Sequence, residues 1–368
     1  MEELSKQATG RASIDVFTTL PNRYASFEVE AARFEERGNY CITRIAIPTH
    51  KSGMKDQILS FKKYYSEVRR LVRNKHYDLV VASSSRLFTA FLGYKLAKRH
   101  KIPLYLDIRD IFYDTLQDVL PTGIVKRIVM PLIKRVEKKT FNYASHINLI
   151  SEGFKPYFEG LSANFSYFPN GIDEIFMHAN RVEMTTKRMK SENLKNIVYA
   201  GNIGEGQGLH KIIPQAAKEL EGRFKFTVIG DGGAKQKLIE GLTDLKVNNV
   251  ELRSPMNRDE LIDVYSGSDF LFVHLNDFKA FEKVLPSKLF ELATFPLPII
   301  AGVRGFAAKF ADENIDNLIL FEPCNVRDFV EKLSLYRYRR LARETFVNKF
   351  TRKKMNQQMA STILAYID

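Results

Sequence analysis

Two glycine-rich turns follow consecutive predicted strands in the second half of the chain. Residues 201–208 come after the apolar run 196–200 and before a helical pattern that begins at Leu209, and residues 230–233 end the next apolar run. Glycines at a strand-to-helix turn let backbone N–H groups approach phosphate oxygens. Each turn alone could be a tight turn without a ligand, since neither fits a dinucleotide or P-loop fingerprint. Together they predict a diphosphate site that includes Gly201, Asn202, Gly204, Gly230, Asp231 and Gly232.

A third segment, Pro286-Ser-Lys-Leu-Phe-Glu291, carries a cation and an acid one helical turn apart. Proline followed by serine predicts that a helix begins near Ser287, which places Lys288 in the first turn. A cation gains nothing from the helix dipole at that position, so a bound anion would explain it. Glu291 could accept hydrogen bonds from both hydroxyls of a ribose. The alternative is a surface ion pair between Lys288 and Glu291.

The order of these segments resembles the donor-binding half of the family 4 retaining glycosyltransferases, which have the GT-B fold. The resemblance rests on Gly201-Asn-Ile-Gly204, Gly230-Asp-Gly232, Tyr265-Ser-Gly-Ser-Asp269 and Pro286-Ser-Lys-Leu-Phe-Glu291. It extends over nearly the whole chain, and Pro169-Asn-Gly-Ile-Asp173 matches the linker between the two domains of the family. The resemblance is strongest to the bacterial transferases of O-antigen and capsule assembly, including those that handle N-acetylfucosamine. In the family, the glutamate that matches Glu291 binds the nucleotide ribose, and a glutamate just upstream contacts the donor sugar.

The sequence departs from the family pattern in three places. The upstream glutamate would fall at Lys283, and the nearest acid is Glu282, which becomes the candidate for the donor-sugar contact. Asn202 and Gln207 stand where many members have basic residues, so the diphosphate charge should fall mainly on Lys288 and on backbone amides. The family's first strand and acceptor-side glycine loop have no counterpart before the first apolar run. We therefore expect an N-terminal domain that lacks its first strand, in a chain that binds donor but transfers sugar poorly.

Charged residues also follow an apolar run in the N-terminal half of the chain. Asp107, Arg109 and Asp110 would lie at the carboxyl edge of a sheet, and Asp110 is the candidate acid on the acceptor side. Charged residues at a strand end are often merely solvated, which is the alternative. Ser151 and Glu152 follow another apolar run, where family members carry a similar pair. A helix cap explains that pair equally well.

The elements that must position these residues alternate between strand and helix, which is typical of parallel sheets. Buried-strand patterns occupy residues 13–18, 78–82, 103–107 and 146–150, and then 196–200, 224–229, 269–273, 298–301 and 317–321. The sequence predicts an α/β protein with two Rossmann-like domains: an acceptor-binding domain (1–172), a donor-binding domain (173–345), and a C-terminal helix (346–368) packing back toward the first domain. Ligands of such sheets bind beyond the carboxyl ends of the strands, so we expect the chemistry in an interdomain cleft.

Composition excludes several classes of protein. The chain has 368 residues, too many for one compact core, and a net charge of +13 from 56 Lys and Arg against 43 Asp and Glu. This charge favours a polyanionic partner, but no nucleic-acid-binding motif accompanies it, so nucleic acid is not expected. Cys41 and Cys324 are far apart, and no histidine or carboxylate group has metal-ligand spacing, so neither a disulfide framework nor a metal site is predicted. Without a membrane-spanning run or a signal peptide, a cytoplasmic protein is expected.

A basic helical stretch, residues 125–139, suggests that the polyanion could be a membrane. Its apolar residues are interspersed with six cationic ones: Lys126, Arg127, Lys134, Arg135, Lys138 and Lys139. Such a helix can lie on an anionic lipid leaflet. It could equally be a core-packed helix with a solvated rim. On the first interpretation the protein is peripheral on the inner face of the cytoplasmic membrane.

These patterns and the resemblance imply a retaining, metal-independent glycosyltransferase of surface polysaccharide (O-antigen or capsule) biosynthesis that uses no cofactor. It would move a sugar from a nucleotide-diphosphate sugar to a lipid-linked saccharide. Two other functions remain open: a GT-B sugar-nucleotide epimerase, and a catalytically impaired nucleotide-sugar-binding subunit of a polysaccharide assembly complex. The predicted catalytic residues are Asp110, Lys288 and Glu282, and the predicted donor-binding residues are Gly201, Asn202, Gly204, Gly230, Asp231, Gly232, Pro286, Ser287, Lys288 and Glu291.

Overall fold

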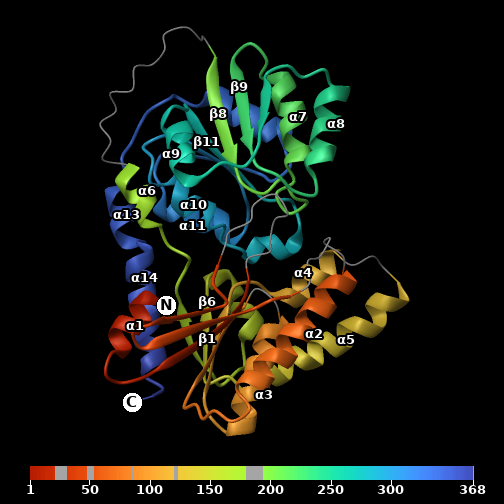
Figure 1. The fold of residues 1–368 in the computed structure, drawn as a ribbon. Coiled ribbons are helices and arrows are strands. Elements are labelled where there is room, and N and C mark those ends of the chain that lie inside the picture. The colour runs from red at the N-terminus through yellow and green to blue at the C-terminus, as the bar shows by residue number, and fades with distance from the viewer. Residues whose placement is uncertain (21–30, 48–53, 85–86, 120–122, 180–193, 368) are drawn as a thin grey trace. The chain divides into compact units, whose positions relative to one another are not determined.

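The computed structural model describes residues 1–20, 31–47, 54–84, 87–119, 123–179 and 194–367 (Figure 1). The chain divides into two compact units, and each is described by itself. Unit 1 comprises residues 1–149, 159–168 and 356–368, and unit 2 comprises residues 150–158 and 169–355. Each unit is built on parallel strands connected through helices, so the predicted α/β class with two Rossmann-like domains is confirmed.

Unit 2 contains a six-stranded sheet in which every neighbouring pair is parallel. The strand order is β10-β9-β8-β11-β12-β13. The strands are β8 (Lys195–Ala200), β9 (Phe224–Ile229), β10 (Val250–Arg253), β11 (Phe270–His274), β12 (Ile299–Gly302) and β13 (Leu318–Phe321). Five of them were predicted. The sequence patterns missed β10, because this edge strand is short and alternates apolar with charged residues.

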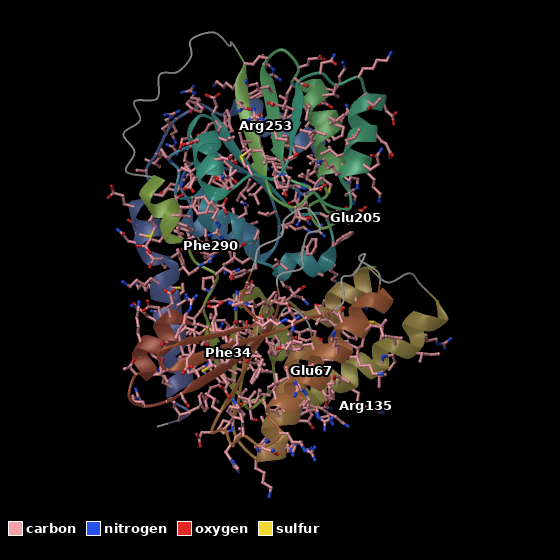
Figure 2. All side chains as sticks on the ribbon, in the orientation of Figure 1. Phe34, Glu67, Arg135, Glu205, Arg253 and Phe290 are labelled. Atoms are coloured by element: carbon pink, nitrogen blue, oxygen red, sulfur yellow. The ribbon has the colours of Figure 1, made fainter. Side chains whose placement is uncertain are left out.

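Helices cover both faces of this sheet, because alternate residues of the buried strands point to opposite faces. Ile197 and Tyr199 join one apolar cluster, whereas Val198 and Ala200 join the other. Phe290, labelled in Figure 2, lies in the second of these clusters. The helices are α6 (Glu174–Ala179), α7 (Leu209–Glu219), α8 (Lys235–Asp244), α9 (Arg258–Ser266), α10 (Lys288–Leu292), α11 (Phe306–Asn314), α12 (Val326–Leu335) and α13 (Glu344–Lys349), with the 3₁₀ helices η1 (Glu152–Phe158) and η2 (Lys279–Lys283).

Unit 1 contains two sheets among the described residues. A four-stranded parallel sheet has the order β4-β5-β6-β7, and a three-stranded sheet has the order β1-β3-β2. The first consists of β4 (Val80–Ser84), β5 (Leu104–Ile108), β6 (His146–Leu149) and β7 (Asn164–Tyr167). The second consists of β1 (Ile14–Thr19), β2 (Phe34–Arg37) and β3 (Tyr40–Ile45), with β2 antiparallel to β3. Helices α2 (Met54–Leu71), α3 (Leu87–His100), α4 (Phe112–Val119) and α5 (Ile124–Phe141) connect the strands.

The hairpin β2–β3 and strand β7 were not predicted. Strand β2 reads Phe-Glu-Glu-Arg, so it has no apolar run, and its turn to β3 depends on Gly38, which has a φ of 62°. Strand β7 is four residues long and begins with an exposed Asn164. Both elements form because neighbouring strands provide hydrogen-bond partners, which a local pattern does not reveal.

The last part of the chain packs on the first helix. Helix α14 (Arg352–Leu364) belongs to unit 1 from residue 356 onward, as does α1 (Glu2–Ala8). Gln7 donates through Nε2 to the carbonyl of Gln357 at 3.1 Å, and Gln357 donates to Glu3 at 2.9 Å. Tyr366 donates to the carbonyl of Ser145 at 3.1 Å, which attaches the chain end beside β6. The two ends of the sequence therefore stabilise the same unit.

A membrane span would need a long apolar helix. None of the helices in the described ranges is long and apolar enough to cross a bilayer.

Candidate functional site

The two predicted glycine turns of unit 2 lie side by side. Strands β8 and β9 end in register, with Ala200 opposite Ile229, so their turns leave the sheet together. Ile203 N–H donates to the carbonyl of Asp231 at 2.8 Å, and Ala234 N–H donates to the carbonyl of Ile203 at 2.9 Å. The structure therefore brings the predicted residues of both turns into one site.

Close approach of the two turns explains why glycine is required there. A Cβ on Gly230, whose φ is 146°, would lie 1.9 Å from the carbonyl oxygen of Gly201. A Cβ on Gly232, whose φ is 156°, would lie 2.6 Å from Ile203 and from the side chain of Asn202. Any larger residue would push the two turns apart.

Strand β11 holds the carbonyl groups of the first turn. Asn276, just beyond β11, donates through its side chain to the carbonyl of Glu205 at 2.7 Å and through its backbone to that of Gly206 at 2.8 Å. His274 Nδ1 donates to the carbonyl of Gln207 at 2.6 Å, and its Nε2 accepts from the backbone N–H of Cys324. Burial lowers the pKa of His274 to about 4, so the ring is neutral and can serve as donor and acceptor at once.

The backbone N–H groups of the same turn point away from β11. The C=O and N–H of a trans peptide point in opposite directions, so fixing the Glu205 carbonyl on Asn276 directs the Gly206 N–H away from β11. Within the ranges that the structure describes, the N–H groups of Gly204, Glu205 and Gly206 donate to no protein acceptor. We call the backbone of 204–206 the amide cradle. Three adjacent amides without protein acceptors can bind the oxygens of an anion.

Charges around the amide cradle are largely compensated. Glu205, labelled in Figure 2, accepts from Lys237 at 2.5 Å, and this hydrogen bond lowers the pKa of the carboxyl. Lys211 donates to Asn276 at 2.8 Å and to Asp277 at 2.9 Å. The Asn202 amide donates to the Gln207 side chain at 2.8 Å, so these two residues form a neutral pair. An anion bound at the cradle would therefore rely on backbone dipoles more than on local cations.

The third predicted segment forms α10, and Ser287 occupies the N-cap position as expected. Lys288 Nζ lies 2.8 Å from Glu291 Oε1, so in this structure the two residues form an i,i+3 ion pair. The same carboxylate oxygen accepts from the hydroxyl of Tyr265 at 3.1 Å. Leu289 and the end of β8 lie in one apolar cluster, which anchors α10 to the core behind the glycine turns.

Glu282 lies in η2, where its carboxylate is 3.3 Å from Arg304. Three glycines, each from a different loop, allow η2 to pack closely. A Cβ on Gly305 would lie 2.3 Å from the Glu282 carbonyl, one on Gly153 would lie 2.6 Å from the Lys283 carbonyl, and one on Gly206 would lie 3.1 Å from Phe281. The segment with Glu282 therefore sits against the amide cradle, and its candidate acid is already paired with a cation.

The carboxyl edge of the sheet in unit 1 carries a row of polar side chains. Ser83, Asp107, Asn148 and Ser166 are register partners on the four consecutive strands. Asp107 is 1% exposed, and it accepts from Ser83 at 2.6 Å, from Asn148 at 2.8 Å and from Arg109 at 2.9 Å. Ser166 donates to Asn148 at 3.0 Å. This row satisfies a buried carboxylate and fixes the register of the strands.

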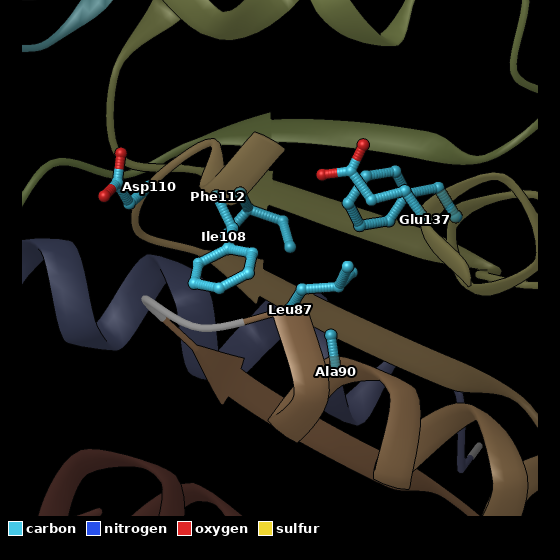
Figure 3. A pocket seen from close by; sticks show the side chains of 7 residues that line it. Leu87, Ala90, Ile108, Asp110, Phe112 and Glu137 are labelled. Atoms are coloured by element: carbon cyan, nitrogen blue, oxygen red, sulfur yellow. The ribbon is translucent and has the colours of Figure 1, made fainter. Parts of the chain in front are cut away.

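Asp110 lies just beyond this row in a small pocket (Figure 3). The pocket is lined by side chains from β5, α3, α4 and α5: Leu87, Ala90, Ile108, Asp110, Phe112, Glu137 and Phe141. Glu137 is buried, and the sequence patterns did not single it out. Two carboxyl groups in one otherwise apolar pocket are suited to hydroxyl groups rather than to anions.

Helix α5 divides its residues between core and solvent. Met130, Ile133, Glu137 and Phe141 face the interior. The opposite face exposes Ile128 (67%) and Leu132 (58%) among basic residues, of which Arg135 is labelled in Figure 2. One face of α5 therefore packs in the core, and the other face presents apolar and cationic side chains. Membrane contact by that second face stays a prediction.

A metal site would need several ligands in one place. Over the described ranges, no group of three or more His, Cys, Asp and Glu side chains could hold a metal ion.

Comparison with known proteins finds similarity over part of the sequence and over the fold. Residues 181–349, which include the glycine turns and α10, match the family model described as glycosyl transferases group 1. This stretch is therefore similar to the group 1 glycosyl transferases. The chain is also 27% identical over 220 residues to WcaI of Escherichia coli (strain K12), which is named as a colanic acid biosynthesis glycosyl transferase. That similarity covers 58% of this chain and 54% of WcaI, so the match spans about half of the relative.

Solved structures share the architecture over the whole chain. Sucrose-phosphate synthase from Thermosynechococcus elongatus superposes with a TM-score of 0.67 at 13% identity, over 100% of this chain and 89% of that one. Anabaena Alr3699/HepE, in complex with UDP and glucose, has a TM-score of 0.66 at 14% identity, over 98% and 93% of the two chains. At these identities the likeness concerns the fold alone. The chain therefore has the GT-B architecture of these structures, and the stretch that is similar to the group 1 glycosyl transferases lies in unit 2.

Sequence reasoning missed the residues that support the site. Tyr265 appeared only as part of a motif, and His274, Asn276 and Arg304 were not among the predicted site residues. A signal was present for two of them, because His274 and Asn276 are polar residues that directly end the strongly apolar run 270–273. Buried polar residues at a strand end usually hold a loop or a ligand. Nothing in the local sequence pairs Tyr265 with Glu291, since they lie 26 residues apart.

Proposed function

We propose that this protein is a retaining glycosyltransferase that takes its sugar from a nucleotide-diphosphate sugar. The observation that carries the proposal is the amide cradle, whose carbonyls are held by β11 while its N–H groups remain available. A diphosphate would supply the oxygens that these amides lack. The structure of Alr3699/HepE in complex with UDP and glucose agrees with a nucleotide donor.

The donor site would stabilise the leaving group. Negative charge grows on the diphosphate as the sugar departs, and fixed N–H dipoles favour that charge without rearranging. Lys288 would add the one positive charge of the predicted set. For this it would turn from Glu291 toward the phosphates, and Glu291 would bind the ribose hydroxyls. Glu282 is proposed to contact the donor sugar through its carboxylate, once it separates from Arg304.

We further propose that unit 1 binds the acceptor and that Asp110 is its acid. Asp110 lines a small pocket, and a carboxylate can accept a hydrogen bond from the hydroxyl group of a saccharide acceptor. In a retaining transfer the departing phosphate oxygen assists deprotonation of the acceptor hydroxyl, by analogy with this fold, so no protein nucleophile is needed. Asp110 would accept a hydrogen bond from that hydroxyl and orient it.

The acceptor is proposed to be a lipid-linked saccharide of surface polysaccharide biosynthesis. The similarity to WcaI, named for colanic acid biosynthesis, supports this class of pathway. The exposed face of α5 supports a membrane-bound acceptor, since Ile128 and Leu132 would enter an anionic leaflet while Lys134, Arg135, Lys138 and Lys139 neutralise it. On this proposal the protein works at the inner face of the cytoplasmic membrane.

Vesicle sedimentation tests the membrane contact. Binding to phosphatidylserine vesicles should weaken as salt rises, because charges are screened over about 8 Å at physiological ionic strength. Replacing Lys134, Arg135, Lys138 and Lys139 by Gln should reduce it, and Ile128→Ser with Leu132→Ser should reduce it at every salt concentration. Leu335→Ser is the control, since Leu335 is an exposed leucine on unit 2. Equal binding by all variants would contradict the membrane proposal.

Transfer is proposed to need no metal ion, because the amide cradle and Lys288 would themselves balance the diphosphate. Activity in excess chelator should equal activity in buffer alone. Loss of activity that magnesium or manganese restores would show that this part of the proposal is wrong.

The donor assignment is tested by the shift in melting temperature with a panel of nucleotide sugars. A nucleotide-diphosphate sugar that binds the folded chain raises the melting temperature, and sugar transfer to a lipid-linked acceptor should follow for the same sugar. Binding without turnover would favour an impaired binding subunit, and release of free nucleotide without an acceptor would favour an epimerase. No shift with any member of the panel would contradict the donor site.

A further inference from the structure

Tyr265, in α9, contacts Glu291, the residue predicted to bind the ribose. Its side chain is 0% exposed, and its ring packs edge-on against Phe295 with centroids 5.2 Å apart. The hydroxyl donates to Glu291 Oε1 at 3.1 Å. Burial first, and then Glu291, raises the pKa of Tyr265 well above its ordinary value, so the hydroxyl keeps its proton and stays a donor.

Lys288 donates to the same oxygen at 2.8 Å. Both hydrogen bonds therefore converge on Oε1, and no described residue donates to Oε2 of Glu291. The two donors differ in mobility. Lys288 is a long side chain in the first turn of α10 and is a quarter exposed, whereas the buried ring of Tyr265 is fixed by its packing.

We propose that Tyr265 is a positioning residue for the donor, which holds Glu291 in place while Lys288 leaves it for the diphosphate. The proposal rests on the proposed function, because it assigns the ribose to Glu291 and the diphosphate to Lys288. Without Tyr265, departure of Lys288 would free the Glu291 carboxylate to rotate. Fixing it again on the ribose would then cost side-chain entropy, which lowers affinity. With Tyr265 in place, Oε2 stays directed at the ribose before and after binding.

The proposal predicts an effect confined to the ribose hydroxyls. The probes are UDP, GDP and ADP, each with its 2′,3′-dideoxy analogue, and calorimetry on the full chain measures affinity for the pair that binds most tightly. Tyr265→Phe keeps the ring and removes only the hydroxyl. We expect it to weaken the ribose nucleotide by about tenfold, which corresponds to loss of one well-placed hydrogen bond, and the dideoxy analogue by less than about twofold.

Two further variants separate positioning from a general loss of stability. Tyr336→Phe also removes a tyrosine hydrogen bond in unit 2, which is partly buried and joins Tyr336 to Asn317, and it should leave both affinities unchanged. Glu291→Ala should remove the preference for the ribose form altogether. Adding Tyr265→Phe to it should then have no further effect, since the hydroxyl acts only through Glu291.

The outcomes distinguish this proposal from the function on which it rests. If Glu291→Ala abolishes the ribose preference and Tyr265→Phe retains it, Tyr265 is structural and the positioning role is wrong. Additive losses in the double variant would lead to the same conclusion. If Glu291→Ala itself keeps the wild-type preference, or if no nucleoside diphosphate binds, the donor-site assignment fails and the positioning role fails with it.

Discussion

Both units end parallel strands at a carboxyl edge, but the edges differ in what they offer a ligand. In unit 2, glycines at the ends of β8 and β9 expose backbone amides, and the side chains nearby are neutral or paired. In unit 1, the edge carries Asp107, Arg109 and Asp110, and a polar row crosses the sheet. The first edge is suited to a polyanion, whereas the second is suited to hydroxyl groups. On the proposed function, one architecture thus serves two kinds of substrate, and the residues at the strand ends decide which kind each unit binds.

The largest effect is expected at the buried carboxylate of unit 1. Asp107→Ala leaves Ser83, Asn148 and Arg109 without their common acceptor, and breaking such a buried pair costs about 3–5 kcal/mol of unfolding free energy. Asp15, whose ion pair with Lys75 is partly exposed, is the matched control, and Asp15→Ala should cost about 1 kcal/mol or less. Urea denaturation followed by circular dichroism measures both. Equal losses would mean that the polar row is not a stabilising feature of unit 1.

The next effect concerns catalysis. Asp110→Asn removes the proposed acceptor-side acid and should lower kcat by about 10²-fold, because a misplaced acceptor hydroxyl reacts more slowly. Donor affinity should not change, because the residue belongs to unit 1. Glu159→Gln, an exposed acid of the same unit, is the control for charge. If Asp110→Asn turns over as fast as the wild type, the carboxyl group of Asp110 has no role in the reaction.

A smaller effect is expected at the donor edge. Lys288→Ala should weaken binding of a nucleoside diphosphate by roughly 10- to 100-fold, because a charge-assisted hydrogen bond contributes about 1.5–3 kcal/mol. Binding of the corresponding nucleoside should not change, since it has no phosphate. Lys309→Ala is the control, because Lys309 is an exposed lysine of α11. An equal loss for nucleoside and diphosphate in Lys288→Ala would place the lysine outside the phosphate site.

The effect that is smallest per pH unit is one of acid sensitivity, and both units should share it. Burial lowers the pKa of His146 and of His274 to about 4, whereas an unfolded histidine titrates near 6.5. The unfolded chain therefore takes up these protons first as the pH falls. Their contribution to unfolding free energy is complete above pH 6.5 and is lost toward pH 4, at up to about 1.4 kcal/mol per pH unit for each histidine.

Variants of the two histidines test whether they cause this loss of unfolding free energy at acid pH. In thermal denaturation between pH 7 and pH 4, His146→Gln and His274→Gln should each reduce the acid sensitivity by about one proton. His274→Gln should also weaken nucleotide binding, since His274 holds a carbonyl of the glycine turn. An acid slope that neither variant changes would contradict the neutral, buried state of these rings.

The sequence predicted the alternation of strands and helices because buried parallel strands are continuous apolar runs. It also predicted both glycine turns and the N-cap at Ser287, since these depend on local backbone conformation. It could not predict the contacts that complete the site. The hydrogen bonds from Tyr265 to Glu291 and from Asn276 to Glu205 join distant segments, as does the ion pair between Arg304 and Glu282. The short edge strands β2 and β10 were not predicted for a similar reason. They form because they pair with a neighbouring strand, and their own composition does not indicate a strand.

The amide cradle is the central feature of the proposed function, and hydrogen–deuterium exchange tests it most directly. Saturating nucleoside diphosphate, drawn from UDP, GDP and ADP, should slow exchange of the amides in residues 204–206, because the phosphate oxygens become their acceptors. Exchange in residues 107–112 of unit 1 should not change, since that edge offers no anion site. Slowed exchange at 204–206 without a change at 107–112 is the result that we predict. Nucleotide binding that leaves these three amides exchanging at their free rate would contradict the donor site proposed here.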